Sequence, residues 1–194
     1  MLQRACVSTE KPLPKLINPA KLAALPPLPP AWVERMAAER GWTPEAIAAA
    51  DLRLFKGYGP ERIAIPIPDN DSNLPNIRLY LPKATGKQLK MINWYEGSKE
   101  TKVTYGGDLL WPAPATWVDG PVWLVEGEPD RIAGLSHQLP GNVVTRTGGA
   151  RSWKAEWLEF FRGRDMILCL DADKTGLAGV ERLADELLGI AARI

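Results

Sequence analysis

Two stretches of the chain, VWLVEGEPD at residues 122–130 and MILCLDADKTG at residues 166–176, decide the fold. Each begins with a short apolar run and passes into acidic and turn-forming residues. Apolar runs of this length, bounded by turn residues and followed by helical patterns, are typical of parallel strands. In an open α/β sheet, ligands bind at the carboxyl ends of such strands. We therefore predict that the acidic residues lie together at one edge of a mostly parallel sheet.

Carboxylates follow both apolar runs: Glu126 and Asp130 come after the first, and Asp171 and Asp173 come after the second. Converging carboxylates repel one another unless a cation neutralises them, and oxygen ligands of this kind suit Mg²⁺ or Mn²⁺. We therefore predict a metal site for phosphate chemistry, with Glu126, Asp171 and Asp173 as catalytic residues and metal ligands. Asp130 is a further metal ligand, although an acid in the first turn of a helix also suits the helix dipole. Glu128 is expected at the surface.

The order Glu126-Gly-x-x-Asp130 and then Asp171-x-Asp173-x-x-Gly176 resembles the signature of the Toprim domain. Bacterial-type primases, type IA and type II topoisomerases and some nucleases share that domain. Upstream, RIAIPI, DNDSN and NIRLY (residues 62–80) are similar to the segment that precedes Toprim in DnaG-type and phage primases. RGWTPE (residues 40–45) resembles a further element of those proteins. The resemblance covers roughly residue 30 to the end of the chain.

The resemblance implies a DNA primase catalytic core that joins ribonucleotides into short RNA primers. It implies a single-stranded DNA template, ribonucleoside triphosphates as substrates, Mg²⁺ or Mn²⁺ as cofactor, and a replicative helicase in cis or in trans as partner. Two alternatives stay open: a Toprim-type nuclease that uses the same acids for hydrolysis, and a non-catalytic DNA-binding domain attached to a helicase. A topoisomerase is disfavoured because no tyrosine nucleophile domain is recognised.

Composition and pattern divide the chain into three parts. Residues 1–30 contain seven prolines, which predicts an extended arm or linker with one helical turn near residues 19–25. Residues 31–118 form a small primase-like α+β subdomain, with helices at 31–40 and 44–50, strands at 63–67 and 76–81, and a third strand within 88–95. Residues 105–119 are expected to be irregular.

Residues 119–194 form an α/β Toprim subdomain, a mostly parallel sheet flanked by helices. Its expected strands are 122–125, 143–145 and 166–170. Its expected helices are 129–138, one around 153–161, and a final helix with one apolar face. Toprim domains of primases continue with another strand and a further acidic motif, so we expect this subdomain to be truncated at its C-terminus or pared down.

Basic residues alternate with aromatic ones between residues 78 and 102. Such a segment suits a groove for single-stranded nucleic acid, although a solvated strand face is the alternative. We predict nucleic-acid or nucleotide contacts from Arg78, Lys87, Lys90 and Lys102. Gly148 and Gly149 follow the second strand of the Toprim subdomain, where backbone amides could hold a phosphate, or form a simple tight turn.

Composition excludes several classes of protein. The chain has 194 residues, of which 45% are hydrophobic, and a net charge of +1, so a core is feasible and any nucleic-acid surface must be local. One histidine and two cysteines cannot build a zinc finger. Cys169 is expected to pack in a buried strand. No apolar run reaches a membrane-spanning length and no signal peptide is recognised, so a cytoplasmic location is expected, in a bacterial cell or for a phage or plasmid protein.

Overall fold

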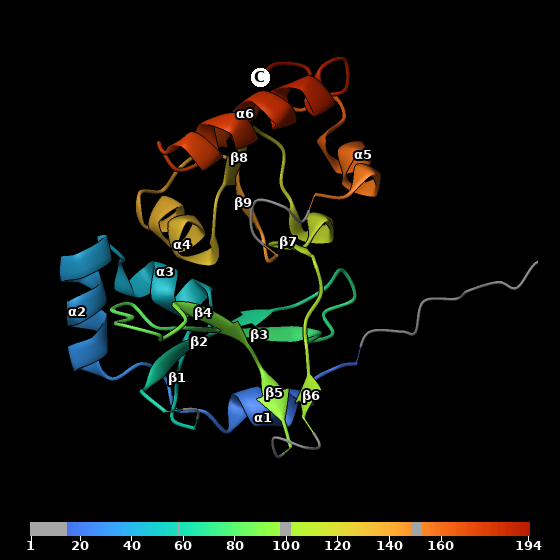
Figure 1. The fold of residues 1–194 in the computed structure, drawn as a ribbon. Coiled ribbons are helices and arrows are strands. Elements are labelled where there is room, and N and C mark those ends of the chain that lie inside the picture. The colour runs from blue at the N-terminus through green and yellow to red at the C-terminus, as the bar shows by residue number, and fades with distance from the viewer. Residues whose placement is uncertain (1–14, 58, 98–101, 149–152) are drawn as a thin grey trace, which may run out of the picture.

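The computed structural model describes residues 15–57, 59–97, 102–148 and 153–194. Two sheets stand one above the other, each with its own helices (Figure 1). The lower sheet is antiparallel and belongs to the N-terminal part of the chain. The upper sheet is mostly parallel and belongs to the C-terminal part, as the sequence predicts.

Three helices begin at prolines in the N-terminal part: α1 (Pro19–Ala23), α2 (Pro30–Arg40) and α3 (Pro44–Ala49). Proline is favoured there because its fixed φ suits the first helical position, where an N–H has no helical partner. The Thr43 side chain accepts a hydrogen bond from the amide of Ala46 and so caps α3. Gly41 ends α2 with a φ of 65°, which glycine adopts without steric cost.

The predicted arm is held against the lower sheet from residue 15 onward. Ile17 is buried, and its amide donates to the carbonyl of Leu74. The amide of Leu54 donates to the carbonyl of Pro26 in the same way. The predicted turn near residues 19–25 is confirmed as α1. Residues 1–14 lie outside the described part of the chain.

The lower sheet has the strand order β1-β2-β3-β4. Its strands are β1 (Arg53–Phe55), β2 (Arg62–Ile67), β3 (Asn76–Tyr80) and β4 (Met91–Asn93). Every residue of β2 is buried because the strand is central and covered on both faces. The predicted strands at 63–67 and 76–81 are therefore confirmed. The predicted third strand is divided, since β4 joins this sheet whereas β5 (Tyr95–Glu96) pairs with β6 (Val103–Thr104) in a separate hairpin.

The upper sheet has the order β10-β8-β9-β7. The strands β8 (Val122–Val125), β9 (Asn142–Arg146) and β10 (Met166–Cys169) are parallel, as predicted. The fourth, β7 (Leu110–Trp111), runs antiparallel to β9 and comes from a segment expected to be irregular. A two-residue strand flanked by prolines and glycine carries no periodic pattern, which is why the sequence did not show it. A 3₁₀ turn, η1 (Pro114–Thr116), follows it.

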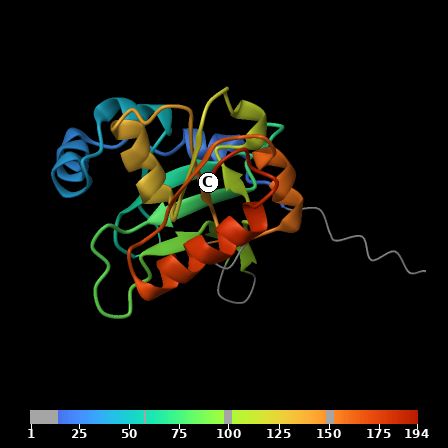
Figure 2. The same cartoon turned by 90° about the horizontal axis from the view of Figure 1, so that it is seen from above.

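Helices α4 (Glu128–Ser136) and α6 (Lys174–Leu187) lie on opposite sides of the upper sheet (Figure 2). The helix expected around 153–161 is only a 3₁₀ turn, η2 (Ala155–Trp157), followed by the short α5 (Leu158–Phe161). Three aromatic residues there, Trp153, Trp157 and Phe161, pack on one another instead. Contacts between these rings, and not a long helix, are therefore the main feature of this segment.

One hydrophobic core is shared by the two sheets. It joins Trp42 and Tyr80 of the lower part to Trp111 and Ile132 of the upper part. The amide of Thr43 also donates to the Ser136 hydroxyl at 3.0 Å, which ties α3 to α4. The helix after the first acidic motif is therefore fixed against the lower sheet.

The prediction that Cys169 is buried is wrong: its side chain is exposed. The reason is that β10 is the outer strand of the sheet, so its last residues have a neighbour on one side only. Only the start of β10 is covered there, where the amide of Met166 donates to the carbonyl of Arg193. No helix in the described ranges is long and apolar enough to cross a membrane.

Candidate active site

Two predicted acids leave the same edge of the upper sheet. Because β8 and β10 are parallel neighbours with Val125 opposite Cys169, the residues that follow them emerge side by side. The Glu126 side chain crosses from one strand end to the other, and its Oε2 accepts a hydrogen bond from the amide of Asp171 at 2.9 Å. Glu126 is partly buried, whereas Asp171 and Asp173 are exposed. We call the edge formed by Glu126, Asp130, Asp171 and Asp173 the acidic edge.

Asp130 and Asp173 each accept from the backbone at the start of a helix. Asp130 Oδ2 accepts from the amide of Gly127 at 3.0 Å, and Asp173 Oδ1 accepts from the amide of Gly176 at 2.8 Å. Burial raises the pKa of Asp130, and the negative charge of Asp171 raises it further, against the hydrogen bond from Gly127. The hydrogen bond between the Asp171 amide and Glu126 brings the two acidic motifs together.

Gly176 is required by a close backbone approach. A Cβ atom built at this position would lie 1.9 Å from the Asp171 carbonyl oxygen, a distance that no side chain tolerates. The first turn of α6 is therefore pressed against the loop that carries Asp171 and Asp173. Glycine at position 176 therefore permits this close approach. At Gly127 the same Cβ meets only ordinary contacts.

The chemistry of the acidic edge fits a divalent cation. All four side chains are carboxylates, which are oxygen donors suited to Mg²⁺ or Mn²⁺. Within the described residues, no three of these side chains converge as a ready-made metal site. Glu126, Asp130 and Asp173 each accept from a backbone amide through one oxygen and have a second carboxylate oxygen beyond it. Metal coordination through the acidic edge therefore stays a prediction.

An ion pair joins the lower sheet to α4, the helix that also carries Asp130. Arg78 of β3 donates through Nε to Glu128 Oε1 of α4 at 2.9 Å, and the Arg78 and Glu128 side chains are 16% and 5% exposed. Arg78 also donates to the side-chain oxygen of Asn93. Burial raises the pKa of the Glu128 carboxyl, and the positive charge of Arg78 opposes this effect.

The position of Glu128 corrects the expectation that it is a surface residue. It stands at the first position of α4, whose N-terminal turn rests on the lower sheet, and the chain therefore buries it. Arg78, predicted to contact nucleic acid, is paired with Glu128 inside the protein. Neither Glu128 nor Asn93 was selected as a site residue, because nothing in a single sequence shows a contact between residues 50 positions apart.

Two cations of the lower part act on Asp130. The positive charges of Lys90 and Arg40 both lower the pKa of that carboxyl, against the effect of burial. Lys90 is exposed and follows the loop between β3 and β4. The Arg40 guanidinium lies over the Tyr80 ring, 5.7 Å from its centroid. Lys90 is one of the predicted site residues. Arg40 is not, and the only sequence signal for it is its place in RGWTPE, the segment that resembles an element of primases.

The other predicted binding residues are placed apart. Lys102 lies over the Tyr95 ring at 4.1 Å, in the β5–β6 hairpin at the far end of the molecule from the acidic edge (Figure 1). Lys87 is exposed in the β3–β4 loop. Gly148 is exposed in the turn that leaves β9, at the same sheet edge as Glu126. Gly149 lies outside the described residues.

Arg146 is a buried cation next to the acidic edge that the sequence did not single out. It is the last residue of β9, is 1% exposed, and its guanidinium nitrogens have no hydrogen-bond partner among the described residues. Burial lowers its pKa, and the negative charge of Glu126 opposes that shift. The acidic edge thus has positive charge behind it at Arg146 and below it at Lys90 and Arg40.

Comparison with known proteins finds similarity at the level of structure. No family model and no curated protein matches the sequence. The primase fragment of the bacteriophage T7 primase-helicase matches with a TM-score of 0.61 and 23% identity, over 80% of this chain and 62% of that one. A DNA primase domain from Pseudomonas aeruginosa matches with a TM-score of 0.60 and 19% identity, over 88% of this chain and 65% of that one.

The zinc-binding and RNA polymerase domains of the Aquifex aeolicus primase match with a TM-score of 0.58 and 19% identity, over 81% of this chain and 47% of that one. The chain therefore spans about half to two thirds of the length of these proteins. The predicted α/β fold, with an α+β part followed by a mostly parallel sheet, is confirmed by these matches. The chain has the fold of the catalytic core of DnaG-type and phage DNA primases.

Proposed function

We propose that the chain is the catalytic core of a DNA primase, which joins ribonucleotides into a short RNA primer on single-stranded DNA. The observation that carries this proposal is the meeting of Glu126 and Asp171 at the ends of adjacent parallel strands, above a sheet that supplies cations, within a primase fold. One solved structure with a similar fold is the DnaG primase catalytic domain bound to single-stranded DNA. We propose that this chain also binds single-stranded DNA.

The acidic edge would hold Mg²⁺ or Mn²⁺ through Asp171 and Asp173, with Glu126 and Asp130 as further ligands. When bound, such an ion polarises the α-phosphate and lowers the pKa of the attacking 3′-hydroxyl. Glu126 bridges the two motifs through its bond to the Asp171 amide, so it keeps the two strand ends at one spacing. Asp130 remains tied to the Gly127 amide and faces the cations of the lower sheet.

Lys90 and Arg40 are placed to bind the phosphates of the template or of the incoming ribonucleoside triphosphate. The positive charges of both lower the pKa of Asp130, so a phosphate bound beside Asp130 would also be attracted by them. Synthesis needs the triphosphate held beside the 3′ end of the primer, and we propose this role for Lys90 and Arg40. We further propose that Lys87, Lys102, Gly148 and Gly149 extend the nucleic-acid path.

Arg78 takes a different role in this proposal. Since it is paired with Glu128 and Asn93, we assign it the positioning of α4, whose first turn also carries Asp130. It therefore acts on the site through Glu128 and not through contact with substrate. A replicative helicase, in the same chain or separate, and a cytoplasmic location complete the proposal.

The test is incubation with single-stranded DNA, labelled ribonucleoside triphosphates and Mg²⁺ or Mn²⁺, scored for both synthesis and cleavage. We expect oligoribonucleotides that disappear with EDTA and in the absence of template. The assay should include the protein at its full natural length beside this chain. Metal-dependent cleavage without synthesis would support the nuclease alternative, and DNA binding without either activity would support a non-catalytic domain.

A further inference from the structure

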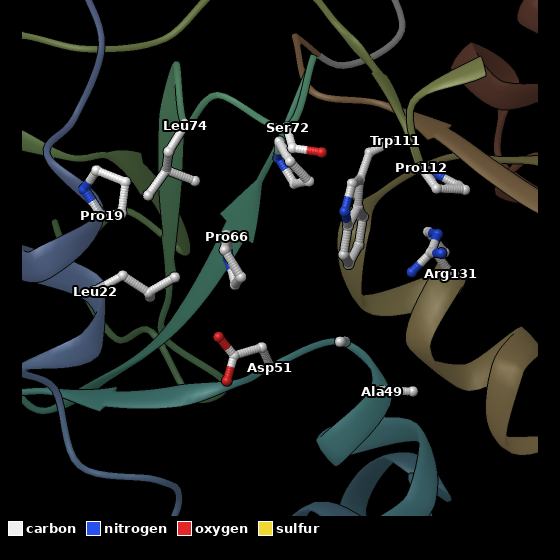
Figure 3. Close-up of a pocket in the computed structure, with 12 residues that line it drawn as sticks. Pro19, Leu22, Ala49, Asp51, Pro66, Ser72, Leu74, Trp111, Pro112 and Arg131 are labelled. Atoms are coloured by element: carbon white, nitrogen blue, oxygen red, sulfur yellow. The ribbon is translucent and has the colours of Figure 1, made fainter. Parts of the chain in front are cut away.

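A cavity of about 370 Å³ lies where the N-terminal segment, the lower sheet and α4 meet (Figure 3). No residue of the acidic edge lines it. Most of its surface is apolar, and the walls include Pro19, Leu22, Pro66, Leu74, Trp111 and Pro112. A volume of this size lies within the range of small-molecule sites in proteins, about 300–1,000 Å³.

One cation, Arg131 of α4, lines this apolar cavity (Figure 3). Two contacts orient its side chain: Nε donates to the carbonyl of Val143 at 3.0 Å, and the guanidinium lies 4.1 Å from the centroid of the Trp111 ring. Arg131 as a whole is only 9% exposed. Burial alone lowers its pKa to about 10, so the charge remains present at neutral pH but is poorly solvated.

Arg131 lacks the partner that a buried arginine normally has. Among the described residues, no carboxylate pairs with Arg131, and its side chain donates only from Nε, to Val143. Asp51, which also lines the cavity, is already paired with Arg53 at 2.8 Å. On the same helix, Glu128 does have its partner in Arg78. The terminal nitrogens of Arg131 are therefore available to a ligand in the cavity.

We propose that this cavity binds a small organic anion with an apolar body. Its carboxylate or phosphate group accepts hydrogen bonds from the terminal nitrogens of Arg131, and its apolar body packs on Trp111, Pro66 and Leu22. A charge-assisted pair of this kind is strong because the guanidinium presents two parallel donors. This site goes beyond the proposed primer synthesis, since it shares no residue with the acidic edge.

The probes are three naphthalene compounds that differ only in the head group: 2-naphthoate, 2-naphthyl phosphate and the neutral 2-naphthylmethanol. Titration calorimetry on the whole chain measures each affinity. We expect at least one anion to bind about tenfold or more tightly than the alcohol, because hydrogen bonds to a charged group contribute about that factor. The two anions separate carboxylate from phosphate recognition. Equal affinity of the anions and the alcohol, or no binding of any probe, overturns the proposal.

Two variants locate the binding. Arg131→Met keeps much of the side-chain volume and removes the charge, so the preference for the anion should fall to about equality; a preserved preference overturns the proposal. Ala49→Phe leaves Arg131 intact and fills the cavity from α3, so every probe should bind more weakly. If circular dichroism shows that Arg131→Met does not fold, Ala49→Phe decides, and unchanged anion affinity in that variant overturns the proposal.

Discussion

The acidic edge and Arg78 of the lower sheet are held in place in different ways. Asp130 and Asp173 bond to backbone amides three residues away, and Glu126 bonds to the strand end next to its own. Arg78, in contrast, is held by a carboxylate 50 residues later in the chain. The acids are therefore positioned by two local motifs and one strand pairing, whereas Arg78 is positioned by the packing of α4 on the lower sheet. Catalysis should therefore depend mainly on the acids. The stability of the packing between α4 and the lower sheet should depend mainly on the pair formed by Arg78 and Glu128.

Removing the paired aspartates should have the largest effect. Asp171→Asn together with Asp173→Asn keeps the shape of the loop and its capping bond while removing two negative charges. We expect primer synthesis to fall below detection with the melting temperature nearly unchanged, because the apolar framework is untouched. Retained activity in a variant that circular dichroism shows to be folded would refute metal binding by these residues.

Breaking the ion pair between the sheets should give the largest loss of stability. Arg78→Met leaves Glu128 buried without its cation, and removing one partner of a buried pair costs about 3–5 kcal/mol. Chemical denaturation at neutral pH measures this loss. The double variant Arg78→Met with Glu128→Gln should recover part of it, since no uncompensated charge remains. A double variant no more stable than Arg78→Met would show that the pair does not hold the sheets together.

The same pair predicts a pH dependence with a definite sign. The folded-state pKa of Glu128 is raised above its ordinary value of 4.5, so the folded state favours the protonated form. The stability contributed by this effect is present below pH 4.5 and is lost as the pH rises through the folded-state pKa. In Arg78→Met, which removes the opposing charge, the loss should be larger. Denaturation curves across acidic and neutral pH, compared with Glu128→Gln, isolate the effect.

Substituting one glycine should damage the acidic edge locally. Gly176→Ala places a Cβ against the Asp171 carbonyl, so either α6 or the acidic loop must shift, at a cost of about 1–3 kcal/mol. Gly179→Ala on the same helix is the matched control, because its Cβ would meet only the end of the Leu170 side chain at 3.1 Å. Synthesis should fall much further in Gly176→Ala than in Gly179→Ala. Equal effects would mean that the loop tolerates displacement.

The exposed lysines should contribute the smallest effect. Lys87→Ala and Lys102→Ala lie on surfaces away from the ion pair, so folding should not change. If each contacts one phosphate of a single-stranded template, each substitution should reduce the slope of log affinity against log salt by about 0.7. Fluorescence anisotropy with an oligonucleotide at several salt concentrations measures it. An unchanged slope in both variants would remove the β5–β6 hairpin and the β3–β4 loop from the binding path.

The sequence could predict the acidic edge because its geometry is local. Each acid follows an apolar run within five residues, and parallel strands place their carboxyl ends at one edge of the sheet; that β8 and β10 are direct neighbours is known only from the structure. The sequence could not predict that Glu128 is buried, since an acid at the start of a helix is equally compatible with solvent. Only the docking of α4 on the lower sheet settles its position, and that docking rests on contacts such as Thr43 to Ser136.

The sequence also could not predict which strand lies at the edge of the sheet, or a strand of only two residues. The exposure of Cys169 depends on β10 lying at the outside of the sheet, and strand order is not encoded in the apolar pattern of the strand itself. Strand β7 has two residues and was read as irregular. Arg131 sits in a helix predicted correctly, but its lack of a partner is a property of the packed molecule alone.

The most direct test of the central claim separates metal binding from nucleotide positioning. Mn²⁺ affinity and dinucleotide synthesis should be measured together in the wild type, in Asp171→Asn with Asp173→Asn, and in Lys90→Ala. We predict that the aspartate variant loses both properties, whereas Lys90→Ala keeps its Mn²⁺ affinity and loses most of its dinucleotide synthesis. If the wild type binds Mn²⁺ and cleaves nucleic acid but forms no dinucleotide, even at the full natural length of the protein, the primase account is wrong.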